Sequence, residues 1–381
     1  MNRWLLAFFA DTFRRTRSLW LTCIEHILFG QFIFTIGLGE YFRPASGRRT
    51  ALASLDEILN MNKRRFFSWE QLRLGLVSGC IALLGTTVSF AATEESLTFV
   101  SGGSRITISL DPQLSQKPEE VVRWVQTAAD AVTNYYHHYP VPTVLISVAP
   151  RRGQAANSGT EYEGRRIVIH LDPGATAEDL SRDWMLTHEM FHLGFPSLPR
   201  KYHYLEEGLS DYLEPLARAR IGKLSERRVW QDFVDGLPQG LPKPGDGGLD
   251  GTRSWGRTYW GGCLFWLLAD VDIREKTNNT RSLDDAIRAI VSAGGTGDAD
   301  WSLERVISVG DGATGTNSIR RIHDWLGPKP VDPHLEELWT KLGVVRREGK
   351  VTFDETAPQA AIRRSMTAKV QASDLLRSSG P

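Results

Sequence analysis

The sequence predicts an α+β fold, in which a small mixed sheet precedes a mostly helical subdomain. Short segments of alternating apolar and polar residues, typical of strands, occur between residues 97 and 171. A helix with two closely spaced histidines follows them, and from residue 205 onward apolar residues recur at helical spacing. The 381 residues, 41% of them hydrophobic, are enough for a sizeable core.

The first subdomain is expected at residues 92–195. Thr176 with Asp179 resembles a capping box, and it should open a helix of about 18 residues that ends near Gly194. The polar stretch 151–164 is expected to be a loop. The other expected elements are strands at 97–100, 105–110, 144–148 and 166–171 and a helix at 119–136.

The helical subdomain is expected at residues 196–367. The stretch 237–253 is rich in Gly, Pro and Asp, so it should form a long surface loop. Residues 368–381 should be a flexible tail. The expected helices are 205–221, 226–233, 258–276, 282–292, 301–309 and 318–326.

Composition and charge exclude some classes of function. The 45 basic and 45 acidic residues balance, so no basic field indicates a nucleic-acid partner, and none is expected. The three cysteines, Cys23, Cys80 and Cys263, are spaced for neither a disulfide framework nor a cysteine metal site. Composition leaves the oligomeric state open.

Residues 61–91 have the layout of a signal peptide. Lys63 to Arg65 supply a positive start, a charge-free and mostly apolar stretch follows, and Ser89 to Ala91 place small residues where a signal peptidase reads them. We expect translation to begin at Met61, so residues 1–60 would be a doubtful extension. The protein should then be exported to the periplasm or secreted, and an uncleaved segment would anchor it in the inner membrane.

A rival interpretation keeps the extension as part of the protein. Trp20 to Leu38 would then be a first membrane segment, but Glu25 and His26 make it a poor one. In either case we expect membrane contact only through the N-terminal segment.

The chemistry is indicated by the H-E-x-x-H string of residues 188–192. His188 and His192 are four residues apart, so on a helix they share one face and can hold one zinc ion. Glu189 between them can reach a water on that metal. The string predicts a zinc peptidase with one Zn²⁺ per chain, although such a histidine pair can also be plain polar surface.

The third metal ligand must come from elsewhere in the chain. A glycine at position 195 and a histidine at 198 would mark a metzincin, but Phe195 and Leu198 stand there. The segment 205–212 reads Leu-Glu-Glu-Gly-Leu-Ser-Asp-Tyr and offers Glu207 instead. The glutamates at 206, 207 and 214 can also be read as an ordinary solvated helix face.

At this segment the sequence resembles the gluzincins, in particular the aminopeptidase N and glycyl aminopeptidase families. The resemblance implies a thermolysin-like (gluzincin) catalytic domain with Glu207 as the third ligand. It also implies that Asp211 orients a ligand histidine, which we expect to be His188. In aminopeptidase N the gap between the second histidine and the ligand glutamate is longer. By that spacing alone, the third ligand in this sequence would be Asp211. We follow the local pattern, because loop length varies more easily than helix register.

The resemblance extends over about Leu180 to Arg288. Tyr259 stands three residues before Gly262, which matches the tyrosine that stabilises the tetrahedral intermediate in both families. Amid several tryptophans, Tyr259 can also be read as plain core. The Gly-x-Met-Glu-Asn motif that captures the substrate amine is missing. Gly159 and Glu161, in a Ser-Gly-Thr-Glu string, are weak substitutes for substrate binding.

The expected function is therefore hydrolysis of a peptide or protein substrate by a zinc-activated water, with Glu189 as general base. Strand 166–171, if it lies at the sheet edge, could hold the substrate backbone. The choice between amino- and endopeptidase action stays open.

A non-catalytic zinc-binding module tethered to the envelope is an alternative, which the intact Glu189 disfavours. Arg182 and Asp183 disfavour an intramembrane protease.

Overall fold

The structure is a computed structural model that describes residues 95–162 and 165–369. These residues belong to one compact unit. The predicted extension, the predicted signal segment and nearly all of the predicted tail lie outside the described residues. Within the described part of the chain, no helix combines the length and the apolar character needed to cross a bilayer.

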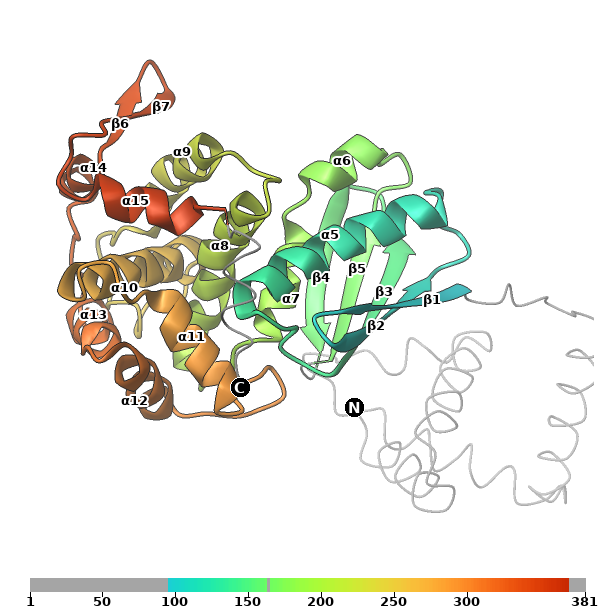
Figure 1. The fold of residues 1–381 in the computed structure, drawn as a ribbon, viewed down its shortest axis with the longest axis horizontal. Helices are drawn as coiled ribbons and strands as arrows, with labels where there is room; N and C mark the ends of the chain where they lie inside the picture. The colour runs from blue at the N-terminus through green and yellow to red at the C-terminus, as the bar shows by residue number, and fades with distance from the viewer. Residues whose placement is uncertain (1–94, 163–164, 370–381) are drawn as a thin grey trace, which may run out of the picture. The chain divides into compact units, whose positions relative to one another are not determined.

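A five-stranded mixed sheet forms the first layer (Figure 1). Its order is β1-β2-β3-β5-β4, in which the three inner strands run parallel and the two edge strands run antiparallel to their neighbours. The predicted mixed sheet is thus confirmed. The strands are β1 (Glu95–Ser101), β2 (Ser104–Leu110), β3 (Thr143–Pro150), β4 (Ala156–Tyr162) and β5 (Arg166–Leu171).

The edge strand β4 corrects two expectations. It lies inside the stretch 151–164, which was expected to be a loop. That expectation arose because the sequence of the stretch is polar and lacks the alternation that marks a strand. Its conformation is set instead by antiparallel pairing with β5. Strand 166–171 is consequently an inner strand, and the neighbouring strand β4 forms that edge of the sheet.

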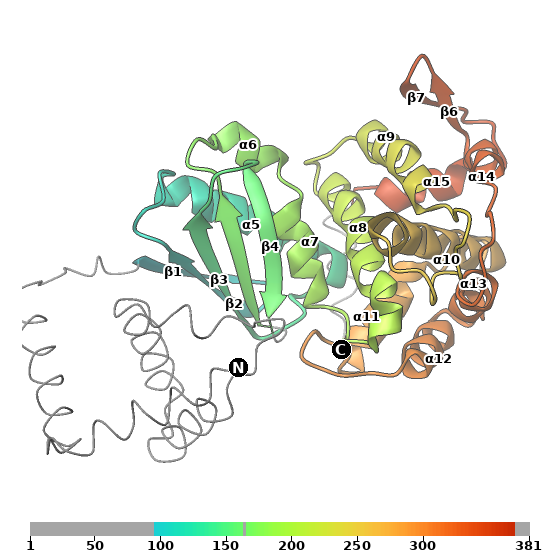
Figure 2. The same cartoon turned by 180° about the vertical axis from the view of Figure 1, so that it is seen from behind.

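One face of the sheet is buried by helices. Helix α5 (Pro118–Tyr136), with proline in its first turn, crosses this face in front of the sheet in Figure 1 and behind it in Figure 2. Alternate residues of the inner strands point to the same side as α5, as a period of two requires. The fully buried members of this core include Ile106, Ile108, Ile146, Ile167 and Ile169.

The expected long helix from Thr176 is two helices, α6 (Ala177–Arg182) and α7 (Met185–His192). The predicted capping box at the start of α6 is confirmed. The break occurs because Asp183 adopts an extended conformation and its carboxylate accepts hydrogen bonds from the backbone N–H groups of Met185 and Leu186, both at 3.1 Å. The histidine motif therefore lies on a short helix of its own.

The rest of the chain is mostly helical, as predicted, and begins with η3 (Arg200–Tyr202) and α8 (His203–Arg220). The helix expected at 258–276 starts as a π-helical turn. The other elements are α9 (Glu226–Gly236), η4 (Leu237–Gly240), the π-helical η5 (Arg257–Gly261), α10 (Gly262–Lys276), α11 (Leu283–Ser292), α12 (Leu303–Thr314), α13 (Ser318–Leu326), α14 (Leu335–Leu342), β6 (Val344–Arg347), β7 (Lys350–Phe353) and α15 (Ala360–Thr367).

Helices α14 and α15 and the β6–β7 hairpin were not predicted. Each helix has eight residues, a length that is unstable alone and depends on tertiary contacts. Arg363 of α15 illustrates such contacts. Its side chain is fully buried over the Phe353 ring and pairs with Glu355 at 2.6 Å.

Helix α8 meets the start of α10 backbone to backbone. A Cβ atom on Gly208 would lie 2.2 Å from Cα of Gly262, and one on Gly262 would lie 1.8 Å from the carbonyl oxygen of Tyr204. No side chain fits at either glycine. This contact fixes the position of Glu207, beside Gly208, relative to Tyr259 in the π-helical turn η5.

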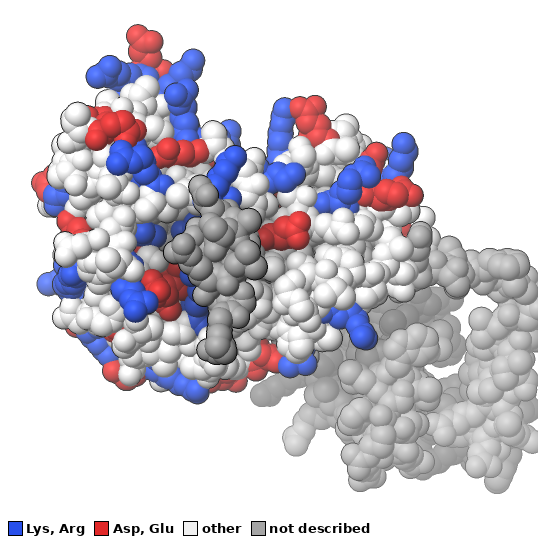
Figure 3. Space-filling model, in the orientation of Figure 1, with Lys and Arg blue, Asp and Glu red and all other residues white. Residues whose placement is uncertain are grey.

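Buried charges join the helices α8, α10 and α11. Arg220 donates to Asp284 at 2.8 Å, and the Tyr212 hydroxyl donates to Asp270 at 2.7 Å. Burial by itself would raise the pKa of Asp284, but the charges of Arg220 and Arg288 outweigh it and hold that pKa below its ordinary value. On the surface, acidic and basic side chains are interspersed over the face shown in Figure 3.

Candidate metal centre and active site

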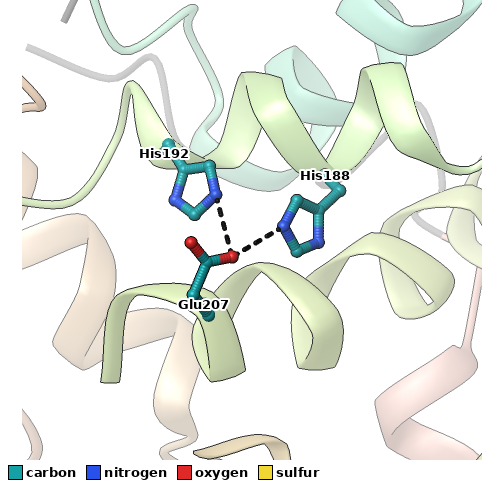
Figure 4. A group of neighbouring side chains, drawn as sticks. All are labelled: His188, His192 and Glu207. Atoms are coloured by element: carbon teal, nitrogen blue, oxygen red, sulfur yellow. Dashed lines mark hydrogen bonds and ion pairs between the residues drawn. The ribbon is translucent and has the colours of Figure 1, made fainter. Parts of the chain in front are cut away.

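The structure brings His188, His192 and Glu207 together (Figure 4). The two histidines project from one face of α7 toward α8, which packs beside it and carries Glu207. Oε2 of Glu207 lies 3.2 Å from Nε2 of His188 and 3.5 Å from Nε2 of His192. Glu207 thus points toward the histidine pair, as the resemblance to the gluzincins implied.

These three side chains fit a zinc ion. Zinc–nitrogen and zinc–oxygen bonds of about 2.0–2.1 Å in a tetrahedron put neighbouring donor atoms about 3.3–3.4 Å apart. The distances from Glu207 to the two histidines are close to this value. Two imidazoles and one carboxylate are also the donor set of catalytic zinc sites that keep a fourth position open. Among the described residues, this is the group of three whose donor atoms all lie within 4.8 Å of one another.

Each histidine has a second partner on α8. Oδ1 of Asp211 lies 3.0 Å from Nδ1 of His188, and Oγ of Ser210 lies 3.3 Å from Nδ1 of His192. Partners at Nδ1 turn the Nε2 atoms toward Glu207. Asp211 therefore has the position expected of an orienting carboxylate, and Glu207 is the acid that faces both Nε2 atoms. The role of Ser210 was not predicted.

Hydrogen bonds within the site shift the pKa values of His188 and Glu207 in opposite directions. His188 is only 4% exposed, and burial opposes its protonation, but hydrogen bonds with Asp211 and Glu207 raise its pKa to about 10. Burial would likewise raise the pKa of Glu207, yet hydrogen bonds from His188, His192 and His203 hold it far below the ordinary value. Glu207 is consequently an anion, ready to neutralise a bound cation.

Glu189 and Tyr259 lie beside this group. Glu189 is 9% exposed on α7, and both residues line the same cleft as the three donors. The Tyr259 ring lies 6.4 Å from the His188 ring, nearly parallel to it. Burial, followed by the charges of Glu207, Asp211 and Glu189, raises the pKa of Tyr259 to about 12. Its hydroxyl therefore keeps its proton at neutral pH.

His203 is a site residue that the sequence interpretation missed. Its side chain is half exposed, and Nε2 of His203 lies 3.2 Å from Oε1 of Glu207. Its Nδ1 lies 2.9 Å from Glu206, which in turn accepts a hydrogen bond from the backbone N–H of Leu198. The available signal was spacing, because His203 stands four residues before Glu207 and so shares its helix face.

Glu214 is also not part of a solvated helix face. It is 6% exposed and accepts a hydrogen bond from Arg218 at 2.5 Å. Burial raises the pKa of Glu214 to about 7, against the lowering effect of Arg218. Glu214 and Arg218 line the cleft beyond Asp211.

Gly159 and Glu161 lie in the edge strand β4, where they pair with Ile169 and Ile167 of β5. Helix α7 contacts this strand. The backbone of β4 is thus close to the histidine helix. That Gly159 and Glu161 bind substrate stays a prediction.

The donors, Glu189 and Tyr259 share a cleft of about 1250 Å³. Its walls come from α7, α8, α9 and the segment around η5. Trp184, Trp255 and Trp260 also line it. The volume is sufficient for several residues of a peptide.

Several solved structures have a fold similar to the one described here. An aminopeptidase N family protein from Idiomarina loihiensis matches it with a TM-score of 0.52 at 13% identity, over 66% of this chain and 50% of that one. An M1 zinc metallopeptidase from Deinococcus radiodurans gives 0.45 at 16% identity, over 63% and 53%. Legionella pneumophila aminopeptidase A, solved with aspartic acid, gives 0.43 at 12% identity, over 63% and 28%.

About two thirds of this chain therefore shares its fold with the Idiomarina aminopeptidase N family protein, which confirms the predicted resemblance at the level of fold. The chain spans about half the length of the first protein and less of the third. No family model matches the sequence, and the search of curated proteins finds no match.

Proposed function

We propose that this chain is a zinc-dependent peptidase of the gluzincin type, with a thermolysin-like catalytic domain and aminopeptidase-like action. One observation carries the proposal. Oε2 of Glu207 faces the Nε2 atoms of both His188 and His192 in a cleft that also contains Glu189 and Tyr259. The fold of the Idiomarina protein supports the same class.

His188, His192 and Glu207 would hold one zinc ion. When bound, zinc supplies Lewis acidity, which makes water nucleophilic near neutral pH and polarises a carbonyl group. Asp211 and Ser210 keep the two imidazoles oriented for this purpose, since each occupies the Nδ1 side of its histidine.

Glu189 is the proton carrier in this proposal. It stands next to His188 in the sequence and is nearly buried in the cleft wall. Its carboxylate takes a proton from the attacking water and passes it to the nitrogen of the leaving amine. The water oxygen adds to the peptide carbonyl carbon, and the C–N bond breaks as the amine is protonated.

Tyr259 is the oxyanion donor. Its raised pKa keeps the hydroxyl protonated, so that it can donate a hydrogen bond to the carbonyl oxygen as negative charge develops there. One such donor is worth about 3 kcal/mol of transition-state stabilisation.

Strand β4 is the element best placed to hold the substrate backbone. Within the described residues it pairs with a strand on one side only, so the other side offers its backbone groups to an extended peptide. Helix α7 contacts β4, which would bring that peptide near Glu189. The substrate is accordingly a peptide or protein that reaches the cleft in an extended form.

The decisive experiment combines metal analysis with a digest of a peptide library by the full chain. We expect about one zinc per chain, as in other catalytic sites with three protein ligands, and metal-dependent cleavage. Glu189→Gln should keep the zinc and lose cleavage. Protein that holds zinc but cleaves no peptide would instead indicate a non-catalytic zinc-binding module, and protein without zinc would overturn both functions.

We also propose export of the protein, on the signal-like pattern of residues 61–91. The N-terminal sequence of the mature protein isolated from its source would test this proposal. A start near Ala92 is expected, whereas a start at Met1 would contradict it.

A further inference from the structure

Two tryptophans of the cleft are unusually exposed. Trp184 and Trp255 expose 47% and 61% of their surface, and both line the cleft of the metal group. The other large exposed hydrophobic residues among those described, Val100 and Leu145, do not line the cleft. Large aromatic surface left in water is unfavourable, and in a cleft it commonly marks a place where a ligand binds.

These tryptophans flank the site in a defined way. The Trp184 ring packs edge-on against His188, with centroids 5.6 Å apart, and the Trp255 ring stacks on Tyr259 at 5.7 Å. The rings of His188 and Tyr259 are themselves 6.4 Å apart. Trp184, His188, Tyr259 and Trp255 thus form a row, here called the aromatic row, with a tryptophan at each end.

The backbone fixes both ends of the aromatic row. Trp184 occupies the break between α6 and α7, which the hydrogen bonds accepted by Asp183 hold in place. Trp255 precedes Gly256, where a Cβ would lie only 2.3 Å from the carbonyl oxygen of Gln239. The segment that carries Trp255 therefore packs closely against η4. Both rings are presented by ordered backbone rather than by loose loops.

We propose that Trp184 and Trp255 bind substrate side chains on opposite sides of the scissile bond, and that the enzyme prefers aromatic or large aliphatic residues there. The inference rests on the proposed function, in which His188 and Tyr259 lie at the reacting carbonyl. Trp184 is next to His188 and Trp255 is next to Tyr259, so each tryptophan lies about one ring spacing from that carbonyl. Residues on the two sides of a bond in an extended peptide direct their side chains to opposite faces, so the two rings can each take one.

Aromatic side chains are the best match for these rings. An aromatic substrate residue can stack on Trp255 or meet the edge of Trp184, and such pairs add to the benefit of burying apolar surface. Small or acidic side chains gain neither contribution. The expected gain is about tenfold in affinity for each side, which corresponds to about 1.4 kcal/mol.

A peptide-library digest with single variants tests the inference. We expect the wild-type chain to cleave beside Phe, Tyr, Trp or Leu, and Trp184→Ala and Trp255→Ala each to lose the preference on one side only. KM for an aromatic peptide should rise about tenfold, with little change in kcat. Trp255→Phe should keep the preference, and the exposed Val100→Ala, outside the cleft, should behave as wild type.

Two readouts separate the inference from the proposed function. If wild type cleaves the library but both alanine variants keep its side preferences, the inference is wrong and the peptidase assignment stands. If wild type cleaves nothing, calorimetric binding of a Phe-containing peptide to Glu189→Gln decides. Binding that weakens about tenfold in the double variant with Trp255→Ala supports the inference, and unchanged or absent binding overturns it. Circular dichroism of each variant checks folding.

Discussion

Nε2 of His203 lies 3.2 Å from Oε1 of Glu207, whereas His188 and His192 are paired with the other carboxylate oxygen, Oε2. The two oxygens of Glu207 therefore have different partners. Oε2 faces the histidine pair of α7, and Oε1 is held from within α8. Because Glu206 holds the other nitrogen of His203, the imidazole is itself fixed.

This arrangement predicts that His203→Ala lowers zinc affinity by about 10- to 100-fold, because an outer partner of a ligand is lost. Competition with a chromophoric chelator measures the affinity directly. His203→Gln retains an N–H donor and should recover part of the loss. Equal zinc affinity in wild type and His203→Ala would mean that the contact does not orient Glu207.

Zinc binding should stabilise the fold. At a free zinc concentration about 1,000 times the dissociation constant, the gain is about 4 kcal/mol. For a folded part of this size that corresponds to a rise in Tm of about 10 °C. Scanning calorimetry with and without a chelator measures it. Glu189→Gln should show the same rise and His192→Ala should show almost none, whereas a Tm indifferent to zinc in the wild type would argue against the site.

Tyr259→Phe should lower kcat by about 100- to 1,000-fold, because the donor acts on charge that develops only in the transition state. KM and zinc affinity should change little, since the ring and its stacking on Trp255 remain. Steady-state kinetics and metal analysis provide both measurements. A rise in KM at constant kcat would assign Tyr259 to substrate binding instead.

Gly208→Ala should destabilise the protein by about 3 kcal/mol, because the new methyl group would collide with the backbone of Gly262. The matched control is Gly312→Ala in α12, where a Cβ meets nothing within 4 Å. That change should be neutral or stabilising by up to about 1 kcal/mol. Urea denaturation of the two variants compares them, and similar midpoints would contradict the tight contact of α8 with α10.

Asp284 should make stability depend on pH in the acid range. Its folded pKa lies below the unfolded value of about 3.9, so its contribution is complete above that pH and is lost as the pH falls through the folded pKa. Asp284→Asn leaves Arg220 without its partner and should cost about 3–5 kcal/mol at pH 7. Denaturation of both proteins should show that wild type and Asp284→Asn differ less in free energy of unfolding at pH 3 than at pH 7. An equal difference at the two pH values would contradict this account.

The local features of this molecule were readable from its sequence. The capping box at Thr176 and the spacing of His188 and His192 involve residues three or four apart, so helix geometry alone fixes their relationship. The place of Glu207 came from its resemblance to a known segment, and the structure does direct it toward the histidines.

Features set by distant contacts were not readable. Strand β4 is a strand because β5 offers it a partner, and its own residues do not alternate. Asp183 breaks a helix through hydrogen bonds that compete with helical ones. The aromatic row combines residues at α7 with residues at and just before η5, two parts of the chain that only the tertiary fold brings together.

The glycine-to-glycine contact between α8 and α10 has a consequence for protein engineering. The carboxylate of Glu207, which would bind the ion, and the hydroxyl of Tyr259, which would donate to the substrate, are both positioned by this one backbone contact. Neither group can be repositioned alone. Attempts to redesign specificity by remodelling the turn around Tyr259 will therefore also alter how tightly the cation is held, and the two properties must be optimised in parallel.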